Sequence, residues 1–336
     1  VDVTGSTTPT DFALANGFLS DGAFDYLLEL EGSQWLLVPE LNSVGAVAGA
    51  APSVLINTFT DLPTLEQRTA SRRWLWTGAT TEEGAASPEQ GVWLRFSGDH
   101  MDATPESNAG VFDYESDTWS TQAGMEFRIA EDARGQWLLG VTLQYGSVDA
   151  DVGNARGRGS VEADGYGAGL TATWDGHNGI YVDLQGQINW IESDFATGSA
   201  GTLVEEHAFT AHAVSVEAGR RFTLKGNHSL IPQAQLILGQ VEGDSFTDNT
   251  GTVIDPGSND SLVARFGLAY NYDLPDAEGR SRRNVYVIGN LLPTLSGTSK
   301  VRVGSAEIRR DYEPTWGELG IGGSIAIREN ARLYAE

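Results

Sequence analysis

Apolar and polar residues alternate along successive segments from residue 90 to residue 336. The clearest segment is 180–190, where isoleucine, valine, leucine and tryptophan alternate with aspartate, glutamine and asparagine. A repeat of two residues is that of a β-strand, whose side chains point to opposite faces in turn. The same alternation predicts further strands in 119–129, 137–145, 166–174, 229–241, 261–273 and 314–327. We therefore expect an all-β, antiparallel fold for 90–336.

The large aromatic residues lie at the ends of these segments rather than in their middles. A soluble sheet places its largest side chains in the core, whereas a membrane barrel places them at the two membrane interfaces. The polar faces are rich in glycine, threonine, glutamine and asparagine, and poor in lysine and glutamate. Both features favour a transmembrane β-barrel. The aromatic residues are Trp119, Trp137, Tyr145, Tyr166, Trp174 and Trp190.

The connections between the expected strands alternate between short and long. We place short turns near 130–135, 175–178, 224–228, 274–283 and 328–330. We place long connections near 98–117, 148–160, 193–206, 242–260 and 295–313. Outer-membrane barrels have short periplasmic turns and longer extracellular loops. The alternation therefore supports an outer-membrane barrel with its acidic loops outside.

The composition narrows the remaining possibilities. The formal net charge of −25 disfavours nucleic acid as a partner, because phosphates attract basic surfaces. The chain contains no cysteine, which excludes disulfides and thiolate metal sites. We find no apolar run as long as the roughly 18 residues that suggest a membrane helix. A barrel is the membrane fold that remains.

Two further regions precede the strands. Residues 1–40 contain short β-like pieces separated by turn residues, and residues 41–75 contain the one sustained helical candidate. We expect a helix from about Pro52 to Arg72, either kinked or restarted at Pro63, because proline suits the first turn of a helix. Leu55, Leu62 and Leu65 do not form a wide apolar stripe, which suggests polar surroundings.

Seven short motifs occur in order along the strand region and together resemble the autotransporter β-domain, the translocator of type V secretion. The resemblance implies a 12-stranded outer-membrane barrel of a Gram-negative bacterium, with a linker helix in its lumen. It also implies outer-membrane lipid, a passenger polypeptide, the barrel-assembly machinery and periplasmic chaperones as partners. The motifs lie at 92–95, 112–114, 164–174, 179–183, 232–236, 261–267 and 316–320.

The first 40 residues resemble the C-terminal end of a pertactin-like passenger. The resemblance implies a small β cap, similar to an autochaperone, that lies on the cell surface and closes a β-helix. Residues 64–68 resemble the end of the family's linker helix. The side chains expected in the apolar core of the cap are those of Phe12, Leu14, Phe24, Tyr26, Trp35 and Leu37.

Charged residues of both signs interrupt the inward faces of the expected strands. We interpret them as a network that grips the linker helix through Glu66, Arg68, Arg72 and Arg73. Arginine suits this role because its guanidinium pairs bidentately with carboxylates. The alternative is simple hydration of a water-filled lumen. The inward charges are Arg95, Glu126, Arg128, Asp183, Glu217, Arg221, Arg265 and Glu318.

Catalysis finds little support in the sequence. The five histidines lack metal-ligand spacing, and the sequence contains no Gly-x-Ser-x-Gly nucleophile motif. We therefore expect no catalytic residue, cofactor or metal, and we predict a translocator that exports and anchors its own passenger. Two alternatives are a general diffusion pore, which a helix in the lumen would block, and a soluble β-sandwich that binds or hydrolyses carbohydrate.

Counting strands from residue 90 makes 314–327 the tenth strand and 331–336 the beginning of the eleventh. The resemblance implies twelve. We therefore expect a barrel that lacks most of its last two strands and stays open, with unpaired backbone groups at its edge.

Overall fold

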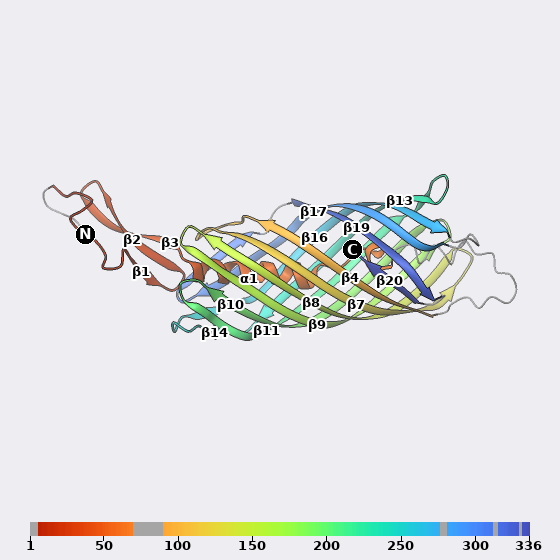
Figure 1. Cartoon of the computed structure of the whole chain (residues 1–336), viewed down its shortest axis with the longest axis horizontal. Coiled ribbons are helices and arrows are strands. Elements are labelled where there is room, and N and C mark those ends of the chain that lie inside the picture. Colours follow the sequence, from red (N-terminus) through yellow and green to blue (C-terminus); the bar gives the residue numbers. More distant parts are fainter. Residues whose placement is uncertain (1–5, 70–89, 276–280, 312–314, 329–330) are drawn as a thin grey trace.

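A computed structural model describes residues 6–69, 90–275, 281–311, 315–328 and 331–336. Figure 1 shows an elongated barrel with a small sheet projecting from one end and a helix inside. Adjacent strands of the barrel pair in antiparallel register, with one exception described below. The barrel strands are β4 (Gln90–Ala103), β7 (Asp113–Glu131), β8 (Gly135–Asn154), β9 (Gly157–Gly176), β10 (Ile180–Thr197), β11 (Gly201–Arg220), β13 (His228–Gly243), β16 (Gly257–Pro275), β17 (Ser281–Val303), β19 (Thr315–Arg328) and β20 (Ala331–Ala335).

Closure of the barrel differs from our expectation. Strand β20 pairs with β4 in parallel register, from Ala331 opposite Val92 to Ala335 opposite Phe96. The described strands therefore close a barrel of eleven strands, not twelve, and the predicted open edge is absent from the part of the chain that the structure describes. Backbone groups facing hydrocarbon must find partners, so even a parallel pairing is better than a free edge. The transmembrane barrel with a lumenal helix is confirmed.

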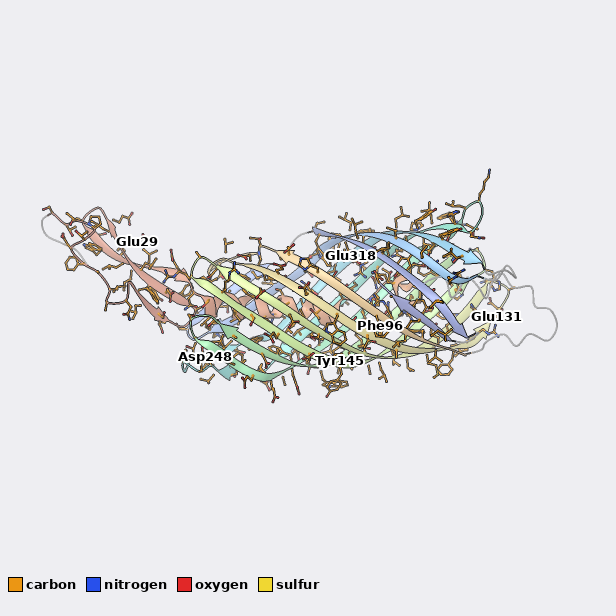
Figure 2. The ribbon with its side chains drawn as sticks, viewed as in Figure 1. Glu29, Phe96, Glu131, Tyr145, Asp248 and Glu318 are labelled. Atoms are coloured by element: carbon orange, nitrogen blue, oxygen red, sulfur yellow. The ribbon has the colours of Figure 1, made fainter. Side chains whose placement is uncertain are left out.

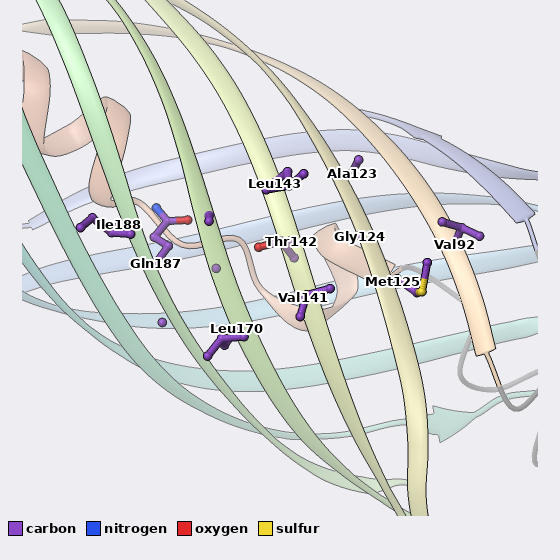
Figure 3. A pocket seen from close by; sticks show the side chains of 13 residues that line it. Val92, Ala123, Gly124, Met125, Val141, Thr142, Leu143, Leu170, Gln187 and Ile188 are labelled. Atoms are coloured by element: carbon purple, nitrogen blue, oxygen red, sulfur yellow. The ribbon is translucent and has the colours of Figure 1, made fainter.

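The register of the membrane-spanning strands matches the sequence pattern. Leu143 and Leu170 lie on the outer wall, with 67% and 68% of their surface exposed, and Leu184 and Leu236 are exposed in the same way. Small residues such as Ala123 leave an apolar pocket of about 740 Å³ in the outer wall, and Figure 3 shows the side chains that line it. This wall therefore has the apolar surface that lipid requires.

The long connections are largely strands, not loops. Strands β8 and β9 stay paired from Trp137 opposite Trp174 to Asn154 opposite Gly157. Strands β10 and β11 similarly continue to a tight turn at Thr197 and Gly201. The predicted loops at 148–160 and 193–206 are thus hairpins that extend the barrel beyond its aromatic residues, of which Tyr145 is labelled in Figure 2. Short strands complete this rim: β5 (Glu106–Ser107), β6 (Gly110–Val111), β14 (Phe246–Thr247), β15 (Val253–Asp255) and β18 (Ala306–Asp311); β12 (Phe222–Thr223) lies at the other end.

Both faces of the barrel wall reverse their polarity in this extension. On β8, Val148 and Val152 point inward and are buried, while Asp149 between them is exposed. Carboxylates of four adjacent strands lie directly opposite one another on the outer wall; we call them the acidic row. They are Asp117, Asp149, Glu162 and Asp194. The barrel is therefore apolar outside and polar inside at membrane level, and the opposite beyond it.

Two names follow from this reversal. The collar is the buried apolar lining of the outer part of the lumen: Phe112, Tyr114, Val148, Ala150, Val152, Val161, Ala163, Ile191, Phe195, Leu203, Phe209, Ala211, Val241, Ile254, Val301, Val303 and Ile308. The polar band is the buried polar lining at membrane level: Gln122, Glu126, Thr142, Thr171, Thr173, Asp183, Gln185, Asn189, Ser215, Glu217, Gln233, Gln235 and Arg265.

A three-stranded antiparallel sheet forms the projecting cap, from β1 (Phe18–Asp21), β2 (Phe24–Glu31) and β3 (Gln34–Leu41). Trp35 is buried and packs edge-on against Phe12, with ring centroids 5.4 Å apart. Phe24 and Tyr26 are half-buried, but Phe12 and Leu37 are each 50% exposed. The predicted core is therefore only partly formed. A single sheet has no second layer to cover its other face.

Helix α1 (Ser43–Thr60) runs through the collar, and the short α2 (Leu65–Thr69) continues into the polar band (Figure 1). The helix begins at Ser43 rather than Pro52, and Pro52 lies inside it. Surrounding apolar contacts outweigh the poor helix propensity of proline and glycine there. By length and composition α1 could cross a membrane, but 89% of it is buried inside the barrel. Our expectation of uniformly polar surroundings is wrong for α1.

Candidate functional site

The lumen and its helix form the candidate site, and the helix starts where the cap ends. The Asn42 side chain accepts a hydrogen bond from the Gly45 amide at 2.9 Å and donates one to the Gly22 carbonyl at 2.9 Å. The first interaction caps the helix, and the second ties it to the cap sheet. A Cβ atom at Gly45 would lie 2.7 Å from the Ala23 carbonyl oxygen, so this close approach requires glycine.

Helix α1 contains no charged residue and is enclosed by the collar. Val47, Val54 and Leu55 are almost completely buried in this shared core. Near the inner end of α1, the Phe59 ring occupies space left by Gly165, where a Cβ atom would overlap it. The helix and the collar therefore fit together as parts of one packed core.

The chain leaves the helical conformation between α1 and α2. Its freed carbonyl groups accept hydrogen bonds from wall amides: Phe59 from Asn189 at 2.7 Å, and Pro63 from Gln185 at 2.7 Å. Proline disfavours helix in the residue before it, here Leu62, which explains the position of the break. Side chains of the polar band thus replace the hydrogen bonds that the helix would have made.

Arg265 on β16 serves the same break. Its guanidinium donates to the Leu62 carbonyl at 2.7 Å, to the Gln235 side-chain oxygen at 2.7 Å and to the Asp61 carboxylate at 2.5 Å. Arg265 is buried. One arginine therefore holds both the backbone and the charge of the linker at this level.

Helix α2 begins with a reciprocal cap. The Thr64 hydroxyl accepts from the Gln67 amide at 3.3 Å, and the Gln67 side-chain oxygen accepts from the Thr64 amide at 2.9 Å. This is a capping box. The wall contributes as well, because Glu217 accepts from the Leu65 amide at 2.8 Å and from the Tyr181 hydroxyl at 2.5 Å.

Arg68 makes the most deeply buried ion pairs described in the lumen. Its guanidinium lies 2.8 Å from Glu126 on β7 and 2.6 Å from Asp183 on β10, and its side chain has no exposed surface. Removing one partner of a buried ion pair leaves an uncompensated charge, which is strongly unfavourable. This triad fixes α2 against two strands of the wall.

The remaining predicted charges have different positions. Glu318 accepts from the Gln67 side chain at 2.9 Å, and Arg95 lies 3.5 Å from Glu336. Arg128 and Arg221 instead pair with Glu131 and Asp273, each at 2.7 Å, and neither pair includes the linker. Glu66 is buried, and Arg72 and Arg73 lie outside the described residues. The structure thus brings Glu126, Asp183, Glu217, Arg265 and Glu318 to the linker.

The sequence interpretation missed the neutral amides that hold the break. Gln185, Gln187, Asn189 and Gln235 all donate to linker carbonyl groups. Their signal was present, because three of them alternate with apolar residues in 180–190. We read that polar face as lumenal without seeing that a helix interruption needs donors opposite it.

The cap is also clasped from outside by the turn between β8 and β9. The Asn154 side chain donates to the Leu41 carbonyl at 2.9 Å, and Arg156 lies 2.9 Å from Asp25. The Arg156 guanidinium also lies 4.7 Å from the centre of the Phe18 ring. Side chains of both the wall and the linker therefore join the cap to the barrel.

Residues 92–336 match the family described as "Autotransporter beta-domain". This match covers most of the chain, including every strand of the barrel. The chain belongs to the autotransporter family. Its β-domain is the barrel that surrounds α1 and α2.

Two relatives extend the likeness of this autotransporter chain. It is 36% identical over 284 residues to the adhesin BmaC autotransporter of Brucella suis, covering 82% of this chain and 8% of that protein. It is 28% identical over 205 residues to the pertactin autotransporter of Bordetella bronchiseptica, covering 60% of this chain and 22% of that protein. The chain thus spans less than a quarter of the length of either relative.

Solved autotransporter structures share the fold. The transport unit of AIDA-I from Escherichia coli has a TM-score of 0.57 at 15% identity, with 80% of this chain and 90% of that one covered. The β domain of Bordetella BrkA has a TM-score of 0.50 at 23% identity, with 73% and 90% covered. Together with the family match, they place this barrel in the outer membrane. Members of the family carry passengers that are exposed at the cell surface.

Proposed function

We propose that this chain is the translocator of a type V secretion system, which exports an N-terminal passenger and then anchors it at the cell surface. The observation that carries the proposal is a continuous path. The chain runs from the cap outside, through Asn42, along α1 in the collar and down to Arg68 in the polar band. Such a path is expected after export, because the segment that joins an exported passenger to its barrel remains in the lumen.

The described lumen is filled by one segment of the chain, which comprises α1, the break and α2. Small or buried side chains surround α1 on all sides, so a folded domain could not pass a lumen of this width. A barrel of this size lies between eight-stranded barrels filled by side chains and wide porins. Export would therefore need an unfolded passenger, and it needs no covalent reaction in residues 92–336.

The same lumen argues against a general diffusion pore. A pore needs continuous water, whereas the collar and α1 form an apolar core without charged residues on the helix. Deleting residues 41–75 should raise single-channel conductance in planar bilayers from nearly closed to clearly open. If the intact protein conducts as well as the deletion variant, the pore is the better description.

The proposed partners follow from the family and from the outer wall. Outer-membrane lipid would contact the exposed leucines at membrane level, and the passenger would continue from the cap. The barrel-assembly machinery and periplasmic chaperones would insert the barrel. Depleting the assembly machinery should leave the β-domain in the periplasm, and normal insertion under depletion would remove this partner from the proposal.

Surface display of a passenger tests export directly. A passenger carrying an engineered disulfide that closes a large loop should stall inside, and a reducing agent should restore its accessibility to extracellular protease. A matched passenger with one of the two cysteines replaced by serine should be displayed in both conditions. Display of the oxidised, cross-linked passenger at the control level would contradict transport in an unfolded form.

A further inference from the structure

We propose that α1 and the collar form a second, non-covalent anchor, which keeps the cap on the barrel even when the chain is cut beyond α2. The proposal deepens the anchoring part of the proposed function by naming what holds the exported end. It concerns the finished state of the protein and not the act of export.

The first support for this anchor is the chemistry of its two surfaces. Val47, Leu55 and Phe59 of α1 share one buried core with Val152, Phe195 and Ile308 of the wall. Withdrawing the helix would expose both the helix and the inward face of the collar to water. The free energy gained by burying apolar surface is roughly proportional to the area buried. Separation is therefore opposed along most of the 18-residue helix.

The second support is the weakness of the alternative anchor. In the polar band, the linker is held mainly by hydrogen bonds from Gln185, Asn189 and Arg265. Water can replace these partners when a linker slides, so each hydrogen bond contributes little net resistance. Arg68 and Arg265 are the exceptions: two carboxylates are buried with Arg68, and buried Arg265 pairs with Asp61, whose side chain is partly exposed. An anchor therefore depends on the collar, on these two arginines or on the cap clasp at Arg156.

The third support is the position of the cap outside the rim. The Asn42 side chain joins the first turn of α1 to Gly22, and the Ser43 hydroxyl lies 2.7 Å from that of Ser199 on the wall. The sheet outside would stop α1 from sliding inward. Only outward withdrawal must be resisted, and that movement breaks the whole contact between α1 and the collar.

The experiment uses the full chain purified in detergent, with an affinity tag in the β7–β8 turn and a specific protease site inserted between Thr69 and Gln90. After complete cleavage, the N-terminal fragment should stay with the tagged barrel. In the Val47→Asp variant, retention should fall by about tenfold or more, because an unpaired charge would be buried in the collar. Arg68→Gln and Arg156→Gln are the comparison variants, and each should lower retention less than Val47→Asp does. Arg128→Gln, whose charge pairs with Glu131, is the matched control and should retain the fragment as the unmodified protein does.

Three outcomes would overturn the anchor: release of the unmodified fragment on cleavage, retention in Val47→Asp equal to the unmodified protein, or a loss of retention in Arg68→Gln or Arg156→Gln as large as that in Val47→Asp. If Val47→Asp prevents folding, Val47→Ala combined with Leu55→Ala replaces it and should shorten retention measurably. Heat-modifiable migration of the barrel controls for folding in each case. No export occurs in this assay. Its failure would therefore contradict the anchor without contradicting export, which is tested separately by surface display.

Discussion

The collar and the polar band hold one continuous linker by opposite means. In the collar, a helix without charges packs among valine, isoleucine and phenylalanine side chains. In the polar band, an interrupted helix is held by amides, Arg265 and the Arg68 triad. The difference follows from what lies outside each wall. A wall that faces lipid needs apolar residues outward and can turn polar ones inward, and a wall that faces water can do the reverse.

The difference between the collar and the polar band would be contradicted if both regions tolerated a new buried charge equally. Ala150→Asp in the collar should lower the free energy of unfolding by roughly 3–5 kcal/mol, because the carboxylate has no partner there. Ser215→Asp in the polar band should cost less than about 2 kcal/mol, because the Gln235 amide already donates to Ser215 at 3.1 Å and Arg265 is bound to Gln235. Urea unfolding in detergent, followed by tryptophan fluorescence, measures both variants. Equal losses would contradict the division of the lumen.

The Arg68 triad tests the polar band itself. Arg68→Gln should cost about 3 kcal/mol by leaving Glu126 and Asp183 uncompensated, and it should raise ion leakage in planar bilayers. Arg128→Gln should cost about 0–1 kcal/mol and leave leakage unchanged, because its pair with Glu131 is partly exposed and does not touch the linker. Similar leakage in the two variants would favour the alternative interpretation, in which the inward charges only hydrate the lumen.

The outer wall reverses along a single strand, and β8 shows this most simply. Leu143→Arg should cost roughly 2–4 kcal/mol in a liposome unfolding assay, because it places a charge against hydrocarbon. Asp149→Arg, six residues further along the same face, should be neutral or stabilising, because it relieves repulsion from Asp117 and Glu162. A similar cost at both positions would move the membrane boundary.

The smallest effect concerns two histidines beyond the membrane level. A hydrogen bond from the His100 ring to the Asp117 carboxylate raises the pKa of His100 above its usual 6.5, whereas burial lowers the pKa of His207. Charged His100 therefore adds stability at low pH that is lost as the pH rises through its folded pKa. His207 acts oppositely, and its effect is destabilising as the pH falls. NMR titration should find His100 titrating at the higher pH, and Asp117→Asn should lower its midpoint. The reverse order would contradict these surroundings.

The strand faces could be predicted because alternation depends only on local sequence. Leu143, Leu170 and Leu184 face outward as their parity indicates. The same alternation continues through Val148, Asp149 and Ala150, within the segment 148–160 that we predict as a long connection rather than as strands. Where a strand leaves the membrane, the two-residue alternation continues, but the polar residues now face outward and the apolar residues inward. That reversal is the signal that the strand continues beyond the membrane.

The pairing of lumenal charges could not be predicted in the same way. Parity places Arg128 and Arg265 alike, yet among the described residues only Arg265 of the two reaches the linker. The level of each linker residue in the lumen depends on where α1 begins, and that start lies nine residues earlier than the proline signal suggested. Asn42 caps the helix, and the linker that starts there brings Arg68 to the level of Glu126 and Asp183 in the polar band.

The acidic row has a consequence for how deeply the barrel sits. Sinking by one pair of residues along β8 would move Asp149 toward hydrocarbon, and rising by the same amount would bring Leu143 and its neighbours at the outer end of the apolar wall toward water. Charges on the lipid face become more costly with depth. The carboxylates above and the leucines below thus oppose vertical movement of the barrel in both directions. The height of the cap above the membrane is therefore set by the barrel wall and not by the cap.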